Sequence, residues 1–158
     1  MDVKKVLFVC TANTCRSPMA ESLLREKLKG LKVYKSFKVD SAGIFANKMD
    51  DVNLYVTNIL KNNNVRPVRH HSYKLTKNML KKYDLVLTMT KKHKEIIKNK
   101  FNDKIDDFSN LFAISEFINS VDIKDPFGNN YETYKETYKL LDFSIDEVIE
   151  KFKNWGWI

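Results

Sequence analysis

The sequence predicts a single α/β domain, built on a parallel sheet, that spans residues 1–158. Short apolar runs of strand length alternate with longer segments in which apolar residues recur at helical spacing, and this alternation is typical of parallel α/β sheets. A length of 158 residues matches one domain. No internal repeat, low-complexity segment or linker interrupts the pattern.

The first half of the chain contains two predicted strands and two predicted helices. Apolar runs predict strands over residues 4–9 and 36–41. A helix is expected to begin at Ser17, a good capping residue that is followed by Pro18 at the first helical position. Its apolar residues recur at helical spacing: Ala20, Leu23, Leu24, Leu28 and Leu31. A second helix is predicted over 50–63.

The second half continues the alternation. Segments 75–82 and 91–100 predict helices, and the apolar runs 84–89 and 111–114 predict strands. A long helix is expected after Gly128, because the apolar residues there form one stripe: Tyr134, Tyr138, Leu141, Ile145, Val148, Ile149 and Phe152. These tyrosines fit helix packing better than a platform for stacking bases.

The composition narrows the class of partner. The net charge of +8 favours anionic partners, but the lysines are scattered, as on a solvated basic surface, and we expect no nucleic-acid partner. No stretch approaches the roughly 20 apolar residues that cross a bilayer, so no membrane partner is expected. The apolar run Val6–Val9 is too short for the core of a signal peptide. The sequence therefore predicts a cytoplasmic protein.

Cysteine and histidine spacing argues against a metal site. Cys10 and Cys15 are the two cysteines of the chain, too few and too close for a disulfide framework or a zinc site. His70, His71 and His93 also lack the spacing of metal ligands. We expect His93 on a solvated helix face, and His70 or His71 as a buried hydrogen-bonding residue. Neither a metal nor another cofactor is predicted.

The turn after the first strand carries the predicted chemistry. It reads Cys-Thr-Ala-Asn-Thr-Cys-Arg-Ser over residues 10–17, where ligands bind in parallel sheets. Backbone N–H groups and the following helix N-terminus would form an anion site, and Arg16 suits phosphate oxygens. The positive charge of Arg16 and the helix N-terminus would also favour the thiolate form of Cys10. Ser17 would donate a hydrogen bond to this thiolate. The alternative is that Cys10 is an inert, buried strand residue.

A proton donor for the leaving group is expected near the C-terminus. Asp125 precedes Pro126, which restrains the backbone around the carboxylate. The alternative is that Asp-Pro only forms a turn before the last helix, completed by Gly128 and Asn129. Spacing alone leaves both interpretations open.

These residues together resemble the low-molecular-weight protein tyrosine phosphatases, nearly from end to end. The run from Val6 to Glu21 looks like the signature strand, loop and helix of that family, and Asp40 to Gly43 resembles its second strand end. His70, fourteen residues before Asp84, matches a family histidine, and Asp125 to Phe127 matches the acid loop. The resemblance implies a four-stranded parallel sheet with helices on both faces, a Rossmann-like arrangement.

The resemblance also implies roles. Cys10 would be the nucleophile that forms a phosphocysteine, Arg16 the phosphate clamp, and Asp125 the general acid and then the base. Ser41 and His70 would support the loop through Asn13. The expected substrate-binding residues are Thr11, Ala12, Asn13, Thr14, Cys15, Ser17 and Phe127. The expected partner is a phosphorylated protein, with inorganic phosphate as product, and the protein is expected to be a monomer.

The phosphorylated residue is left open by the sequence. Phosphotyrosine is the substrate that the family implies first. However, Thr11, the run from Ser41 to Ala46 and the run from Asp125 to Gly128 look most like the bacterial branch that includes protein arginine phosphatases. Tyrosine-specific relatives tend to have a larger apolar residue at the Thr11 position and an aromatic pair after Asp-Pro. Phosphoarginine is therefore the alternative.

Two other functions, a phosphoprotein-binding module and an arsenate reductase, are weighed by the residues at single positions. Ala12 stands where the family usually has glycine, and an alanine with positive φ would cost about 1 kcal/mol or more, so an inactive phosphoprotein-binding module is the remote alternative. Arsenate reduction is disfavoured because it requires further cysteines, and none follows Cys15. Cys15 is expected either to form a protective disulfide with Cys10 or to be a small packing residue.

Overall fold

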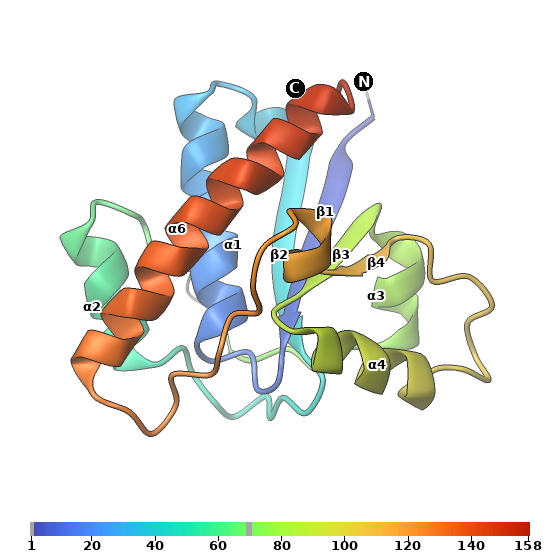
Figure 1. Ribbon diagram of the computed structural model, residues 1–158, viewed down its shortest axis with the longest axis horizontal. Coiled ribbons are helices and arrows are strands. Elements are labelled where there is room, and N and C mark those ends of the chain that lie inside the picture. Colours follow the sequence, from blue (N-terminus) through green and yellow to red (C-terminus); the bar gives the residue numbers. More distant parts are fainter. Residues whose placement is uncertain (1, 69–70) are drawn as a thin grey trace.

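The computed structural model describes residues 2–68 and 71–158 and contains a four-stranded parallel sheet with helices on both faces (Figure 1). Every pairing in the sheet is parallel, and the strand order is β2-β1-β3-β4. The strands are β1 (Lys4–Cys10), β2 (Phe37–Gly43), β3 (Leu85–Thr88) and β4 (Leu111–Ala113). The predicted fold class and sheet are confirmed.

The sheet is buried on both faces, which explains its continuous apolar runs. Successive side chains of β1 point to opposite faces. Val6 and Phe8 join the core beneath α1, α2 and α6, whereas Leu7 and Val9 join a second core beneath α3 and α4. The helices are α1 (Arg16–Gly30), α2 (Leu54–Asn62), α3 (Lys77–Lys82), α4 (Lys91–Lys100), α5 (Ile114–Phe117) and α6 (Tyr131–Asn154).

Helix α6 closes one face of the molecule. All seven residues of its predicted apolar stripe are buried: Tyr134, Tyr138, Leu141, Ile145, Val148, Ile149 and Phe152. Lys27 of α1 forms ion pairs with two residues of α6. Its Nζ lies 2.7 Å from a carboxylate oxygen of Asp142 and 2.8 Å from one of Asp146. These contacts hold α1, and with it the loop before α1, against the body of the protein.

Several element boundaries differ from the predicted ones. The helix expected over 50–63 begins at Leu54, because the side chain of Asn53 accepts a hydrogen bond from the backbone N–H of Tyr55 and caps it. Ser17 does not cap α1. Cys15 occupies the cap position without a side-chain hydrogen bond, and Ser17 is free for another role. The run 111–114 stops being a strand at Ala113, where the short α5 begins.

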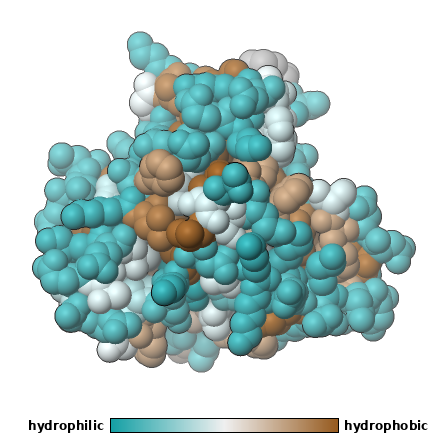
Figure 2. Space-filling view, in the orientation of Figure 1, coloured by the Kyte–Doolittle hydropathy of each residue, from teal (hydrophilic) through white to brown (hydrophobic). Residues whose placement is uncertain are grey.

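The strand order creates a switch point. The chain leaves β1 toward β2 on one side and later continues from β3 on the other, so the loops after β1 and β3 diverge and open a crevice. Figure 1 places both ends of the chain at the far end of the sheet from this crevice. Figure 2 shows a mostly hydrophilic face with small, separated hydrophobic patches. No helix in the described ranges is long and apolar enough to cross a membrane.

Candidate active site

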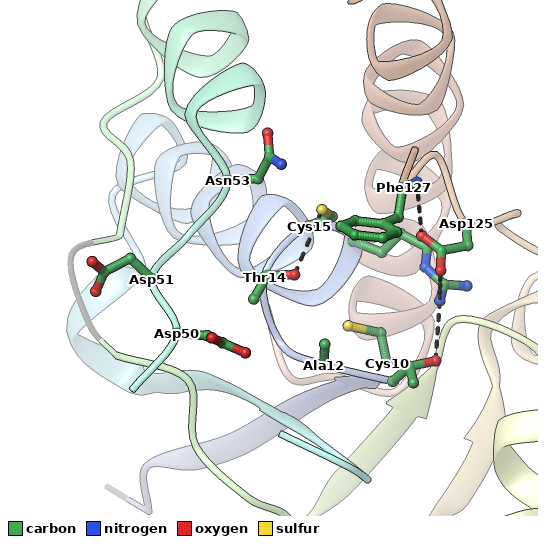
Figure 3. A pocket seen from close by; sticks show the side chains of 11 residues that line it. Cys10, Ala12, Thr14, Cys15, Asp50, Asp51, Asn53, Asp125 and Phe127 are labelled. Atoms are coloured by element: carbon green, nitrogen blue, oxygen red, sulfur yellow. Dashed lines mark hydrogen bonds and ion pairs between the residues drawn. The ribbon is translucent and has the colours of Figure 1, made fainter. Parts of the chain in front are cut away.

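A cavity of about 490 Å³ opens at the carboxyl end of β1 (Figure 3). It lies at the switch point, where the fold predicts a ligand. Its walls come from the loop after β1, the segment before α2 and the loop before α6: Cys10, Thr11, Ala12, Thr14, Cys15, Arg16, Asp50, Asp51, Asn53, Asp125 and Phe127. The three residues predicted to be catalytic, Cys10, Arg16 and Asp125, are thus brought to one cavity.

The loop over residues 10–17 is shaped by Asn13. This residue is fully buried and has a φ of 59°, in the left-handed region that asparagine tolerates better than most residues. Its Nδ2 donates to Ser41 Oγ at 2.8 Å and to Ser17 Oγ at 2.9 Å. Its Oδ1 accepts the backbone N–H of Tyr73 at 3.0 Å. Asn13 and Ser41 therefore hold the turn together, whereas His70 lies outside the described residues.

Ala12 carries no backbone strain. The left-handed turn of the loop falls on the following residue, Asn13, and Ala12 is not among the described residues with positive φ. The position that does require glycine is Gly43, at the end of β2. A Cβ atom there would lie 2.7 Å from the carbonyl oxygen of Thr11 and 2.8 Å from the carbonyl carbon of Ala12. The loop thus rests directly on the backbone of Gly43.

Cys10 presents its sulfur to the cavity (Figure 3). The residue is otherwise buried, and its Sγ lies 2.9 Å from Ser17 Oγ. Asn13 Nδ2 donates to Ser17 Oγ, so the one proton of this hydroxyl lies between two acceptors, the Cys10 sulfur at 2.9 Å and the carbonyl oxygen of Ala42 at 3.4 Å, of which the sulfur is the nearer. The α1 N-terminus begins at the neighbouring Arg16, and its dipole favours negative charge there. The arrangement suits a thiolate nucleophile.

The Arg16 guanidinium is buried and held from three sides. Its Nη1 donates to the carbonyl oxygen of Ile123 at 2.9 Å. Its Nη2 lies 3.4 Å from Thr11 Oγ1 and 3.7 Å from a carboxylate oxygen of Asp125. Through these contacts Arg16 links the loop after β1 to the loop that carries Asp125. The second loop is itself held to the residue after β3, because the backbone N–H of Ile123 donates to the carbonyl of Met89.

Asp125 lies in a turn and also borders the cavity. The Asp125–Gly128 segment is a turn, in which Asp125 Oδ1 accepts the backbone N–H of Phe127 at 3.0 Å and Gly128 has a φ of 80°. The same carboxylate is half exposed and faces Arg16. A carboxyl group in this position can exchange a proton with a ligand in the cavity. The Phe127 ring is 71% exposed and lies at the cavity rim.

One prediction about the histidines is wrong, and a second is narrowed to His70, which lies outside the described residues. His93 was expected on a solvated face of its lysine-rich helix, but it is buried, and its Nε2 lies 2.9 Å from Thr11 Oγ1. Burial, followed by the nearby charge of Arg16, lowers the pKa of His93 to about 4. His71 is exposed, with its Nδ1 2.8 Å from a carboxylate oxygen of Asp51, so it is not a buried hydrogen-bonding residue.

The segment before α2 was missed as part of the site. Asp50, Asp51 and Asn53 line the cavity, although the sequence placed them inside a helix. The backbone N–H of Asn53 donates to the carbonyl of Thr14 at 2.9 Å, which brings the segment to the loop. Figure 3 shows the Asp50 carboxylate turned toward the cavity and that of Asp51 turned away. Asn53 before an apolar helix start was the available signal for the true boundary.

Cys15 faces the interior next to α6. Its Sγ lies 3.7 Å from the hydroxyl of Tyr134 and 3.7 Å from that of Thr14. Burial raises the pKa of the Cys15 thiol, and the two hydroxyl contacts only partly offset this. Cys15 is therefore a protonated thiol at neutral pH, which is less reactive than a thiolate.

The sequence is similar to known phosphatases over nearly its whole length. Residues 5–155 match the family described as low molecular weight phosphotyrosine protein phosphatase. The chain is 36% identical to a protein-arginine-phosphatase of Geobacillus stearothermophilus, over 94% of this chain and 96% of that protein. It is 35% identical to the low molecular weight protein-tyrosine-phosphatase PtpB of Staphylococcus aureus, over 87% of this chain and 91% of that protein.

A solved structure agrees with the fold. A mutant of the YwlE arginine phosphatase with a phosphorylated active-site serine superposes with a TM-score of 0.86 at 31% identity, covering 94% of this chain and 95% of that one. The sheet and its helices are therefore those of a known architecture.

Proposed function

Because this chain belongs to the low molecular weight phosphotyrosine protein phosphatase family, we propose that it hydrolyses phosphorylated protein side chains with Cys10 as nucleophile. The observation that carries the proposal is the convergence of Cys10, Arg16 and Asp125 on one cavity, with Ser17 Oγ 2.9 Å from the Cys10 sulfur. Neither a metal nor another cofactor is required by these groups.

The proposed reaction has two steps. The Cys10 thiolate attacks phosphorus, the bond from phosphorus to the leaving atom breaks, and Asp125 gives its proton to that atom. Asp125, now a carboxylate, takes a proton from water as the water attacks phosphorus, which releases phosphate and restores the thiolate. The phosphorylated active-site serine of the YwlE mutant supports a covalent intermediate at this position.

Arg16 would stabilise the transferred phosphoryl group. Its buried guanidinium already has its orientation set by the Ile123 carbonyl, so little reorganisation accompanies phosphate binding. The guanidinium and the N–H groups of the loop before α1 would bind the three equatorial oxygens. Because Arg16 also contacts Asp125 at 3.7 Å, a phosphate bound to it lies next to the proton donor.

For the phosphorylated residue, the cavity favours phosphoarginine. The carboxylate of Asp50 borders the cavity, and a carboxylate pairs with a guanidinium but has no partner on a phenol ring. Thr14 adds a polar side chain to the wall. Phosphotyrosine is the second candidate, because the exposed Phe127 ring at the rim offers a surface for an aromatic side chain.

We also propose the compartment, the oligomeric state and the partners of the protein. Both cysteines are free thiols, which fits the reducing cytoplasm. The protein would act as a monomer on phosphorylated protein, with inorganic phosphate as product and without nucleic acid.

The test is phosphate release from matched phosphoarginine and phosphotyrosine peptides in the presence of a chelator. We expect release by the wild-type protein, none by Cys10→Ser, and a preference for phosphoarginine. Asp50→Asn should reduce activity on phosphoarginine, and Phe127→Ala should reduce activity on phosphotyrosine. Absence of release from either peptide by reduced wild-type protein would contradict the phosphatase assignment, and a preference for phosphotyrosine would reverse the order of substrates.

A further inference from the structure

His93 reaches the cavity loop from a different part of the fold. It lies in the first turn of α4, and its backbone N–H donates to the side chain of Thr90, which caps the helix. Its ring extends across the switch point to the loop after β1, where Nε2 lies 2.9 Å from Thr11 Oγ1. Thr11 in turn lines the cavity. A buried imidazole thus contacts the wall of the active site without lining the cavity itself.

The proton on the His93 ring can be assigned from its neighbours. Nδ1 is buried and has no hydrogen-bond partner among the residues that the structure describes. A buried N–H without an acceptor is rarer in folded proteins than an unpaired acceptor. The neutral ring therefore carries its proton on Nε2 and donates it to Thr11 Oγ1.

The Thr11 oxygen then accepts two hydrogen bonds. The Arg16 guanidinium has no acceptor atom, so its Nη2, 3.4 Å away, also donates to Thr11 Oγ1. A hydroxyl has two acceptor lone pairs and one proton. With both lone pairs used by His93 and Arg16, the proton of Thr11 is directed away from them, and the cavity is the space that Thr11 borders.

We propose that His93 is a positioning residue that makes the Thr11 hydroxyl an obligatory hydrogen-bond donor to the phosphate in the cavity. This inference rests on the proposed phosphatase function and deepens it by adding a donor, fixed before the substrate arrives, to Arg16 and the loop N–H groups. A hydroxyl held in this way needs little reorientation when the anion binds.

The charges around His93 keep it in this role. Burial disfavours a charged ring most, and Arg16 and Lys92 add to this effect. Asp125 and Asp122 act in the opposite direction, and the pKa of His93 falls to about 4. The ring is therefore neutral throughout the neutral range. His93 orients Thr11 and exchanges no proton with the substrate.

The experiment is a double-mutant cycle on phosphate binding. The variants are Thr11→Val, His93→Leu and the double substitution, and the main readout is the Kd of inorganic phosphate by titration calorimetry, accompanied by kcat and KM. Thr11→Val should weaken phosphate binding roughly 10- to 100-fold, as expected for loss of a hydrogen bond to a charged group. His93→Leu should weaken it in the same direction, and the double variant should bind no worse than Thr11→Val, because His93 acts through Thr11.

Conservative replacements separate positioning from packing. The amide nitrogen of glutamine lies near the place of Nε2 and that of asparagine near Nδ1, so His93→Gln should retain phosphate binding and His93→Asn should lose it. This pair also decides the matter if His93→Leu does not fold. Additive losses in the double variant, an unchanged Kd in His93→Leu, or equal Kd values for glutamine and asparagine would overturn the inference. A wild-type protein that binds phosphate but hydrolyses no phosphopeptide would contradict the proposed function alone.

Discussion

The side-chain oxygen of Ser17 lies 2.9 Å from the sulfur of Cys10, inside the first turn of α1. The same oxygen accepts from Asn13 Nδ2 at 2.9 Å. Its one proton is shared between the Cys10 sulfur and the carbonyl oxygen of Ala42 at 3.4 Å, and the sulfur is the nearer acceptor. Asn13, which donates to this oxygen, also determines the shape of the loop. Nucleophile stabilisation and loop geometry are thus connected through one hydroxyl group.

Ser17→Ala should reduce kcat by about 10-fold or more, because a hydrogen bond to a charged group contributes about 1.5–3 kcal/mol. The rate of Cys10 alkylation by iodoacetamide below neutral pH should fall as well, since the thiolate is the reactive form. Ser22→Ala is the matched control, because Ser22 Oγ donates to the carbonyl of Pro18 within the same helix. Equal alkylation rates in wild type and Ser17→Ala would contradict this role.

Asp125→Asn should reduce kcat by roughly 10²- to 10⁴-fold with a poor leaving group, the range expected for general acid catalysis. The loss should shrink with an activated leaving group such as p-nitrophenolate, which needs little protonation. The measurement is the dependence of kcat on leaving-group pKa for a series of aryl phosphates. Asp122→Asn, three residues earlier, is the comparison variant. A loss that is the same for every leaving group would point to a structural effect.

Gly43→Ala should damage the active site although Gly43 does not line the cavity. A Cβ atom would come within 2.8 Å of three backbone atoms of the loop, and overpacking of this kind costs about 1–3 kcal/mol. We expect a lower free energy of unfolding in urea and a kcat reduced at least 10-fold. Gly30→Ala is the control, because nothing lies within 4 Å of a Cβ there. Full activity in Gly43→Ala would show that the loop tolerates displacement.

The buried His93 should make folding stability dependent on pH. Its pKa of about 4 in the folded protein lies below the ordinary 6.5, so between these values the unfolded chain binds more protons. The free energy of unfolding should therefore fall as the pH drops from 6.5 toward 4, by up to about 3 kcal/mol from this residue. Urea unfolding of His93→Gln should show a flatter pH dependence over that window, and parallel curves would contradict the assignment.

Cys15 is predicted to protect Cys10 from irreversible oxidation. Peroxide would convert the Cys10 thiolate to a sulfenic acid, and the Cys15 thiol would attack that sulfur, release water and form a disulfide. Since burial raises the pKa of Cys15, Cys10 should react first. After peroxide treatment, dithiothreitol should restore the activity of the wild type but not of Cys15→Ser. Equal recovery would leave Cys15 as a packing residue.

The sequence predicted the elements best where local pattern and burial coincide. Strands such as β1 and β3 are buried on both faces, so their apolar runs were unambiguous. The end of β2 was placed two residues early, because Ala42 and Gly43 are small and carry no strand signal. The start of α2 was placed too early, since Val52 extends the apolar pattern past the true cap at Asn53.

The sequence placed in one loop the site residues that are adjacent in the chain, and it missed distant residues that the fold brings to the same cavity. Cys10, Arg16 and Ser17 belong to one loop, and their contacts follow from its shape. The contact between His93 and Thr11 joins residues 82 positions apart, and a lysine-rich helix gives no local sign that its histidine points inward. Asp50 was missed for the same reason, because only the fold brings its segment to the cavity.

The position of the chain ends has a practical consequence. Both lie at the end of the sheet far from the Cys10 loop (Figure 1). An affinity tag, a fluorescent protein or a surface linker attached at either end would thus leave the cavity mouth open to large phosphorylated substrates. Near the two ends, Lys4 Nζ lies 5.3 Å from the centroid of the Trp157 ring. The ends could therefore be joined by a short peptide and new ends opened elsewhere, for instance in the exposed turn around Asp103 between α4 and β4.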